Sequence, residues 1–214
     1  MGANVARPAA ESSPFTLAAM SVAALILAAG ESRRLGRPKQ LIVYQGETLL
    51  NRAIRISFEA GASPVIAVLG SRFDEVRASI ASGGAITVRN DRWRQGMGRS
   101  IETGMRALGV CAPGADAVLL MGCDQPRLTP EHLRALMNAV AGAESAAIAA
   151  SSYAGIHGVP AVFPRAAFDE LRALRGEKGA RSIIDRGVTP VVAIEFQGGE
   201  VDIDAPVDLA RLAE

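Results

Sequence analysis

Glycines and cationic side chains gather directly after an apolar run near the start of the chain. The run Val22–Ala28 leads into Gly30, and the remaining members of the cluster are Arg33, Arg34, Gly36, Arg37 and Lys39. Glycine lets the backbone approach a ligand without a Cβ atom in the way. Exposed backbone N–H groups and cationic side chains then bind phosphate oxygens. The cluster therefore predicts a phosphate-binding loop, and the alternative is a solvated basic turn.

This loop matches neither of the common glycine-rich nucleotide motifs. Gly30 and Gly36 are one residue too far apart for GxxxxGK(S/T), and no glycine between them completes GxGxxG. The position of the loop still favours a phosphate site. It follows the first buried strand, and α/β proteins place their ligands at the carboxyl ends of such strands.

Carboxylates that could hold a metal ion occur in the middle and near the end of the chain. Asp124 follows the apolar run Ala117–Met121, so it lies at the carboxyl end of a predicted strand. Mg²⁺ bound to nucleotide phosphates takes one or two carboxylates from the protein. The alternative is an ordinary turn aspartate before Pro126. Asp202 and Asp204 lie in an extended stretch, where we expect them to point to opposite faces, so that only one faces the site.

Short apolar runs and longer amphipathic stretches alternate along the chain. The predicted strands are Val22–Ala28, Pro64–Leu69, Ile86–Arg89, Ala117–Met121, Ala146–Ala150, Ala161–Phe163 and Pro190–Ile194. The predicted helices are Thr48–Ala60, Asp74–Ile80, Ser100–Leu108, Pro130–Val140, Ala166–Leu174, a turn at Arg181–Asp185, and Pro206–Leu212. This alternation predicts an α/β fold, a Rossmann-like three-layer sandwich with helices on both faces of a mainly parallel sheet.

The chain shows no internal repeat and no Gly/Ser linker. We therefore expect residues 21–214 to form a single domain after a disordered extension at residues 1–20. The segment Phe15–Ala29 has the length of a signal-peptide apolar region. Few cations precede it, however, and cleavage near Ala29 would remove the strand that positions Gly30. We therefore expect a cytoplasmic protein.

Bulk composition limits the class of partner. The net charge is +1 and aromatic residues make up 4%, whereas nucleic-acid binding needs a broad basic surface or stacking platforms. No apolar run is long enough for a membrane span. We therefore expect neither nucleic acid nor membrane as a partner. Cys111 and Cys123 form no disulfide framework, and we expect Cys123 to be a buried thiol.

Sequence motifs along most of the chain resemble those of a known enzyme family. The first is Leu27-Ala28-Ala29-Gly30-x-Ser32-x-Arg34-Leu35-Gly36-x-Pro38-Lys39. The others are Gly46-x-Thr48-Leu49-Leu50, Gly96-Met97-Gly98-x-Ser100, Cys123-Asp124-Gln125-Pro126, Gly158-x-Pro160-x-x-Phe163, Gly179-Ala180-Arg181 and Asp202-Ile203-Asp204-x-Pro206-x-Asp208. Together they resemble the nucleotidyltransferases that attach a nucleotide to the molybdenum cofactor. The first motif and Asp-Gln-Pro indicate the superfamily more than one substrate.

The resemblance implies a nucleotide-diphospho-sugar transferase type of fold and a set of nucleotide-binding residues. Lys39 and Arg34 occupy fixed motif positions and are the expected catalytic cations, together with Asp124. Asp124 and Asp204 are the expected Mg²⁺ ligands. The expected nucleotide contacts are Leu27, Ala28, Ala29, Gly30, Lys39, Gly98 and Ser100, and Asn90, just after a short strand, is a further candidate for the ribose or base. A glycine-rich helix start such as 96–98 could also be a mobile loop.

The second half of the chain is expected to bind the acceptor. His157 in a predicted loop, Gly158 and Arg181 are the candidate acceptor contacts. The resemblance implies Mg²⁺-dependent transfer of CMP from CTP to the phosphate of the molybdenum cofactor, with release of pyrophosphate. Ala29 favours CTP, because the related guanylyltransferases have glycine at this position.

Three other functions stay open on the sequence. One is nucleotidyl transfer to a sugar or polyol phosphate, and another is a non-catalytic molybdenum-cofactor-binding partner of a molybdoenzyme. If the molybdenum cofactor is the ligand, a molybdoenzyme or its chaperone is the expected protein partner. The third is an oxidoreductase on the same fold, which the lack of GxGxxG does not support.

Overall fold

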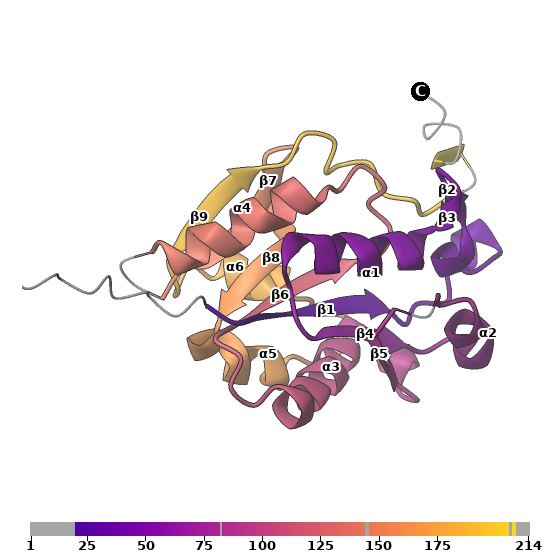
Figure 1. Cartoon of the computed structure of the whole chain (residues 1–214), viewed down its shortest axis with the longest axis horizontal. Helices are drawn as coiled ribbons and strands as arrows, with labels where there is room; N and C mark the ends of the chain where they lie inside the picture. Colours follow the sequence, from indigo (N-terminus) through magenta and orange to yellow (C-terminus); the bar gives the residue numbers. More distant parts are fainter. Residues whose placement is uncertain (1–19, 82, 144–145, 206, 209–214) are drawn as a thin grey trace, which may run out of the picture.

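The computed structural model describes residues 20–81, 83–143, 146–205 and 207–208. Its main sheet has seven strands in the order β5-β4-β1-β6-β8-β7-β9 (Figure 1). Their bounds are β1 Val22–Ala28, β4 Val65–Leu69, β5 Ile86–Arg89, β6 Ala117–Gly122, β7 Ile148–Tyr153, β8 Ile156–Pro164 and β9 Val191–Glu195. A separate hairpin pairs β2 Val43–Tyr44 with β3 Glu47–Thr48. The predicted α/β class and mainly parallel sheet are confirmed.

Parallel pairing at the centre of the sheet aligns the strand ends that matter for function. β1 pairs in parallel with β4 on one side and with β6 on the other. The register sets Leu27 opposite Gly122, so β1 and β6 finish at the same edge. The loop at Ala28–Gly30 and the residues after Gly122 therefore start side by side. β8 breaks the parallel order, because it runs antiparallel to both β6 and β7.

Helices cover both faces of the sheet. Their bounds are α1 Leu49–Ala60, α2 Phe73–Ala78, α3 Met97–Cys111, α4 Pro130–Ala141, α5 Phe168–Ala173 and α6 Arg181–Asp185. Single 3₁₀ turns lie at η1 Arg33–Leu35, η2 Lys39–Leu41, η3 Trp93–Gln95 and η4 Arg165–Ala167. The helices α1 and α4 lie over one face and α3 and α5 over the other (Figure 1).

Strand β1 shows how one short sequence serves both layers. Ala24, Ile26 and Ala28 pack into the core beneath α1 and α4. Ala23 and Leu25 alternate with them and pack into the core above α3. All five side chains are at most 3% exposed, as expected for a strand that is buried on both faces. This burial holds the end of β1 in place for the loop that follows.

Local sequence signals define the ends of the two helices on the first face. Thr48 caps α1 by accepting a hydrogen bond from Asn51 N at 3.2 Å, and Gly61, at φ 99°, ends the helix. Thr129 caps α4 in the same way through His132 N at 3.3 Å, with Pro130 in the first turn. These are the residue types that helix caps prefer.

The structure corrects several predicted boundaries. Helix α3 begins at Met97 rather than Ser100, so Gly98 lies inside its first turn. His157 lies in strand β8 and not in a loop. The predicted helix at 206–212 and the predicted extension at 1–20 fall largely on residues outside the described part of the chain.

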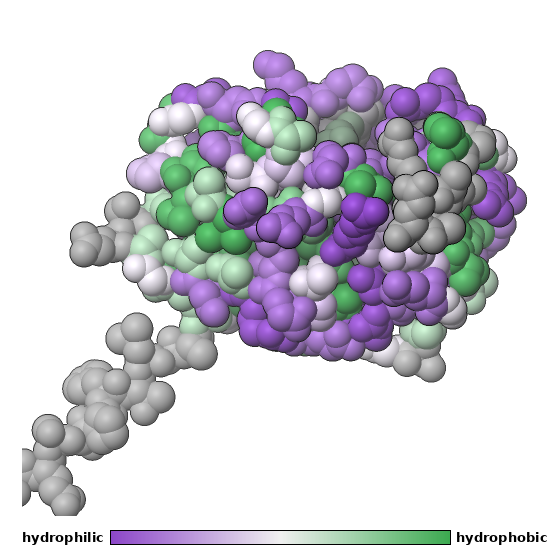
Figure 2. All heavy atoms as spheres, turned by 90° about the horizontal axis from the view of Figure 1, so that it is seen from above, coloured by the Kyte–Doolittle hydropathy of each residue, from purple (hydrophilic) through white to green (hydrophobic). Residues whose placement is uncertain are grey.

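Within the described ranges, no helix combines the length and the apolar character that crossing a bilayer requires. Hydrophilic side chains predominate on the face seen in Figure 2, and apolar residues are interspersed among them.

Gly104 and Gly109 of α3 offer a matched test of this packing. A methyl group at buried Gly104 would overlap with the Leu25 side chain of β1, whereas Gly109 is exposed, with only Arg172 nearby at 3.8 Å. We expect Gly104→Ala to lower the free energy of unfolding by about 1–3 kcal/mol through overpacking. Gly109→Ala should raise it by up to roughly 1 kcal/mol through helix propensity. Urea denaturation measures both, and equal effects would contradict the close approach of α3 to β1.

Candidate active site

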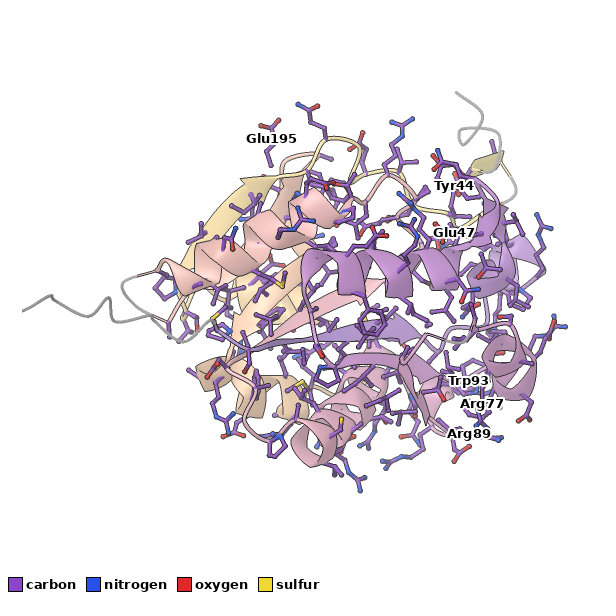
Figure 3. The ribbon with its side chains drawn as sticks, viewed as in Figure 1. Tyr44, Glu47, Arg77, Arg89, Trp93 and Glu195 are labelled. Atoms are coloured by element: carbon purple, nitrogen blue, oxygen red, sulfur yellow. The ribbon has the colours of Figure 1, made fainter. Side chains whose placement is uncertain are left out.

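A cavity of about 440 Å³ lies where β1 and β6 end. Its walls come from the loop after β1, the residues after β6, and the segment that leads into α3. The lining residues are Leu27, Ala28, Ala29, Gly30, Glu31, Ser32, Arg33, Lys39, Gln40, Trp93, Arg94, Gly96, Met97, Ser100, Cys123, Asp124 and Glu177. Trp93 lies at the end of the sheet toward which the β1 arrow points (Figures 1 and 3). The cavity thus occupies the edge of the sheet where the sequence predicted a phosphate site.

The Gln40 side chain fixes the turn after β1. It is 1% exposed, and its Nε2 donates to Ala28 O at 2.7 Å and to Gly30 O at 3.1 Å. Ser32 adopts a left-handed conformation at φ 56°, and its Oγ accepts a hydrogen bond from Lys39 N at 3.1 Å. Both ends of the basic loop are therefore tied to the end of the strand by polar contacts.

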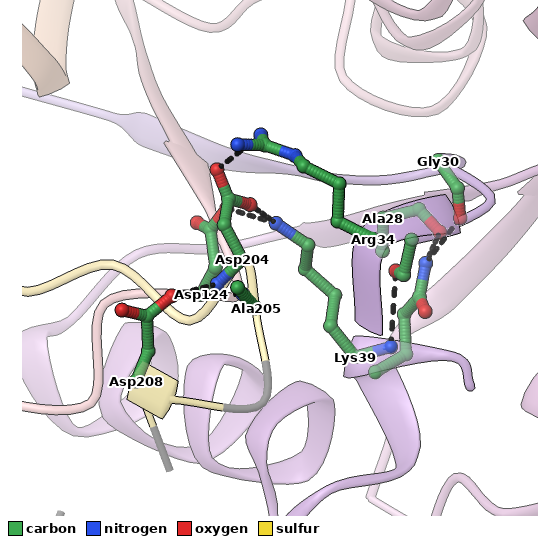
Figure 4. Close-up of polar contacts among 10 residues, drawn as sticks. Ala28, Gly30, Arg34, Lys39, Asp124, Asp204, Ala205 and Asp208 are labelled. Carbon is green, nitrogen blue, oxygen red and sulfur yellow. Dashed lines mark hydrogen bonds and ion pairs between the residues drawn. The ribbon is translucent and has the colours of Figure 1, made fainter. Parts of the chain in front are cut away.

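A cluster of two cations and two carboxylates lies beside the cavity (Figure 4). Lys39 Nζ donates to Asp124 Oδ2 at 2.8 Å and to Asp204 Oδ1 at 2.5 Å. Arg34 Nη2 donates to the second oxygen of Asp204, Oδ2, at 2.9 Å. The Lys39 side chain is 17% exposed and that of Arg34 is 75% exposed. Lys39 is therefore the central cation, and Arg34 closes the cluster from the solvent side.

Electrostatics hold Lys39 and Asp204 in their ionised forms. Burial alone would lower the pKa of Lys39, but the negative charges of Asp124 and Asp204 outweigh it and raise that pKa above its usual range. The hydrogen bond from Lys39 lowers the pKa of Asp204, despite partial burial. The lysine thus remains an ammonium and Asp204 a carboxylate around neutral pH.

The segment that carries Asp204 is docked across the end of β6. Ile203 N donates to Asp124 O at 3.0 Å, which joins the two aspartate segments directly. The Ile203 side chain is 0% exposed and packs in a small core cluster with Leu35, Ile42 and Leu49. Asp208 Oδ2 accepts hydrogen bonds from the backbone N–H groups of residues 204 and 205. Apolar burial therefore brings Asp204 to Lys39 from 165 residues away.

Residues 24–191 match the model of the family described as MobA-like NTP transferase domain. The chain belongs to this family of nucleotidyltransferases. The predicted superfamily is thereby confirmed, whereas nucleotide and acceptor stay predictions.

Several relatives of this MobA-like transferase have curated names. It is 29% identical to the purine catabolism protein PucB of Bacillus subtilis, over 88% of this chain and 95% of the relative. It is 30% identical to the nicotine blue oxidoreductase of Paenarthrobacter nicotinovorans, over 83% of this chain and 77% of the relative. It is 29% identical to a probable molybdenum cofactor guanylyltransferase of Opitutus terrae, over 78% of this chain and 79% of the relative.

Among solved structures, Rv0371c of Mycobacterium tuberculosis in complex with manganese is similar to this chain. The TM-score is 0.71 at 31% sequence identity, and the match covers 91% of this chain and 98% of that one.

The structure corrects the expected orientation of Asp202. In an extended segment, residues two apart share a face, and buried Ile203 separates Asp202 and Asp204 by pointing into the core. The expectation that the two aspartates face opposite ways is therefore wrong. Desolvation by the surrounding protein and the charges of Asp124 and Asp204 raise the pKa of Asp202 to about 7.

Sequence reasoning also missed residues near Asp202. Desolvation, and after it the charge of Asp202, raises the pKa of Tyr153, whose hydroxyl donates to Val159 O at 3.1 Å. Gln125, part of the Asp-Gln-Pro motif, donates through Nε2 to Gly199 O at 2.9 Å and holds the chain that leads to Asp202. The motif itself could have indicated Gln125, but no local signal marks Tyr153.

Two predicted nucleotide contacts of the MobA-like transferase lie behind the cavity wall. Asn90 is 2% exposed, and its Nδ2 donates to Ser100 Oγ at 3.0 Å. It therefore orients Ser100, which lines the cavity. Gly98 N donates to Gly176 O at 2.9 Å, and a Cβ atom at Gly98 would lie 2.7 Å from Arg175 N. Gly98 thus lets the start of α3 approach the loop at 175–177, and its N–H is already bonded within the protein.

The predicted acceptor residues lie apart from the cavity. His157 is exposed on β8. Gly158 is buried, and a Cβ atom there would lie 2.9 Å from the Tyr153 hydroxyl oxygen, so it makes room for Tyr153. Arg181 begins α6 and pairs with Asp185 at 3.3 Å. None of these three residues lines the cavity, and their acceptor role stays a prediction.

The carboxylate pair fits a divalent cation that also binds phosphate. Asp124 and Asp204 each give one oxygen to the same cationic group, the Lys39 ammonium. Across the described ranges, no group of three or more His, Cys, Asp and Glu side chains is arranged to hold a metal ion. Two carboxylates are what Mg²⁺ commonly takes from a protein when phosphates complete its coordination. Cys123 adds no ligand, because burial raises the pKa of its thiol to about 12.

Gly122 tests how strictly the Asp124 carboxylate must be placed. A methyl group at Gly122 would overlap with Asp124 Oδ1, the free end of a side chain, so the carboxylate must rotate while the strand stays. We expect Gly122→Ala to melt within a few degrees of wild type yet lose roughly 100-fold in turnover, because misplacement by about 1 Å has that effect. Pyrophosphate release measures turnover.

Gly114→Ala is the matched control, since a Cβ atom there meets open space. It should leave both melting temperature and turnover unchanged. A fully active Gly122→Ala variant would mean that the position of the Asp124 carboxylate does not limit the reaction.

Proposed function

We propose that this protein transfers CMP from CTP to the terminal phosphate of the molybdenum cofactor, with Mg²⁺, and releases pyrophosphate. The observation that carries the proposal is the Lys39–Asp124–Asp204 cluster beside the cavity at the end of β1. Family membership supports nucleotidyl transfer, and the molybdenum cofactor guanylyltransferase relative supports the acceptor.

The geometry suits a displacement at the α-phosphorus. An oxygen of the acceptor phosphate forms the new bond to the α-phosphorus, the bond to the bridging oxygen of the β-phosphate breaks, and pyrophosphate leaves. Such a transfer needs positioning and neutralisation of charge rather than covalent help from the protein. When bound at Asp124 and Asp204, Mg²⁺ would neutralise phosphate charge and orient the reacting groups.

The residues of the chain supply the remaining parts. Lys39 lines the cavity, so its ammonium can reach donor phosphates and stabilise the negative charge that develops on the leaving pyrophosphate. Arg34 adds a second cation from the solvent side. Gln40 holds the turn Ala28–Gly30, and the backbone of this turn would meet the base and phosphates.

The preference for CTP rests on Ala29. This residue lines the cavity, at a position where the related guanylyltransferases have glycine. An added methyl group in the cavity wall favours the smaller pyrimidine over a purine.

Nucleotide competition tests this preference. With the molybdenum cofactor as acceptor and equal concentrations of labelled CTP and GTP, we expect CMP to be incorporated in excess. A single methyl group gives roughly 10–200-fold discrimination, so some GMP incorporation should remain. Preferential GMP incorporation would overturn the cytidylyl assignment. No pyrophosphate from CTP, GTP, ATP or UTP with this acceptor would overturn the proposed function.

Substitution of the loop cations distinguishes a specific phosphate-binding site from a diffuse positive surface. We expect Lys39→Ala and Arg34→Ala each to lower kcat/KM strongly, roughly 100-fold or more for Lys39, with much of the loss in kcat because the charge acts in the transition state. Exposed Arg37 is the control, and Arg37→Ala should produce only a small effect that salt screens. Steady-state kinetics of the three variants at two ionic strengths measures these effects. Equal, salt-sensitive effects in all three variants would contradict a specific site.

A further inference from the structure

We infer that Lys39 and a divalent cation compete for the same place between Asp124 and Asp204, so that Lys39 weakens the binding of free metal and favours metal that arrives with a polyphosphate. This inference deepens the proposed function and rests on it for the identity of the polyphosphate.

The geometry of the lysine contacts carries the inference. Lys39 Nζ lies 2.8 Å from Asp124 Oδ2 and 2.5 Å from Asp204 Oδ1, so one cationic nitrogen bridges both carboxylates (Figure 4). A metal ion that used both carboxylates would need the space that this nitrogen fills. The other oxygen of Asp204 is bonded to Arg34 at 2.9 Å. The pair therefore cannot bind a metal ion between Asp124 Oδ2 and Asp204 Oδ1 and keep the Lys39 contacts at the same time.

The charges of the cluster lead to the same conclusion. Lys39 and Arg34 carry two positive charges, and Asp124 and Asp204 carry two negative charges. The cluster is therefore neutral as it stands. A divalent cation would add two positive charges in a site that is partly shielded from water, where unbalanced charge is costly. A polyphosphate brings the negative charge that offsets this excess.

The Lys39 ammonium also has a second position that it can occupy, in the cavity. Its side chain lines the cavity as well as touching the carboxylates, and its backbone N stays anchored to Ser32 Oγ at 3.1 Å. A lysine has a flexible four-carbon stem and a rotatable ammonium. The ammonium can therefore move from the carboxylates to phosphates in the cavity without a change in the loop.

The two movements are thermodynamically linked. A polyphosphate that draws Lys39 into the cavity leaves the carboxylates free for the metal, and a metal on the carboxylates leaves Lys39 free for the polyphosphate. Such coupling is reciprocal and typically amounts to roughly 5–150-fold in affinity.

Manganese binding without nucleotide or acceptor tests the competition. Free Mn²⁺ is counted by electron paramagnetic resonance during titration of the full chain, as wild type and as Lys39→Met. We expect Lys39→Met to bind Mn²⁺ about tenfold more tightly than wild type, within that coupling range. Lys178, which is exposed, provides the matched control, and Lys178→Met should bind Mn²⁺ as wild type does.

Two further variants keep the test decisive. Lys39→Gln removes the charge with a polar side chain and serves if Lys39→Met does not fold, as judged by its melting curve. Adding Asp124→Asn to the Lys39 variant should abolish the gain in affinity. Unchanged or weaker Mn²⁺ binding by the folded Lys39 variant would overturn the inference, and so would a gain that survives Asp124→Asn.

These measurements distinguish a failure of the inferred competition from a failure of the proposed function. Tighter Mn²⁺ binding by the Lys39 variant, with no pyrophosphate release by wild type, would leave the competition standing and remove the cytidylyl transfer. Transfer by wild type with no gain in Mn²⁺ binding would do the reverse.

Discussion

The carboxylates of Asp124 and Asp204 bring two negative charges close together at a partly shielded edge of the sheet, and such charges must be neutralised there. Lys39 does this through one ammonium that bonds to both carboxylates. The requirement shapes its surroundings. The basic loop is bonded to the end of β1 through Gln40, Gly122 leaves room for the Asp124 side chain, and buried Ile203 brings Asp204 within reach.

Parallel pairing of β1 with β6 supplies the framework for this cluster. Because both strands finish at one edge, the loop after β1 and the aspartate after β6 meet although they lie 85 residues apart in the chain. The apolar residues of β1 are buried on both faces, so its end cannot shift without disturbing two cores. The rigid strand end fixes the position of the loop, and the flexible lysine stem lets the Lys39 ammonium change partners.

The sequence predicted most of the strands because they are continuous apolar runs, and Ile86–Arg89 matches β5 in both bounds. It predicted α1 and α4 from amphipathic stretches, which are a local pattern. It missed the first half of β8, where glycine, histidine and proline obscure the strand pattern. The sequence also did not predict contacts between distant segments. Nothing local shows that Asn90 bonds to Ser100, or that Ile203 bonds to Asp124.

The docking of Ile203 onto Asp124 has a consequence for the order in which the molecule is made. A ribosome completes β1, the basic loop and β6 well before it reaches residue 203, so Lys39 and Asp124 can meet early in synthesis. The second carboxylate arrives only when the late segment folds back over Leu35, Ile42 and Leu49. A nascent chain therefore contains every residue that lines the cavity, the last of which is Glu177, before it contains the second carboxylate, Asp204.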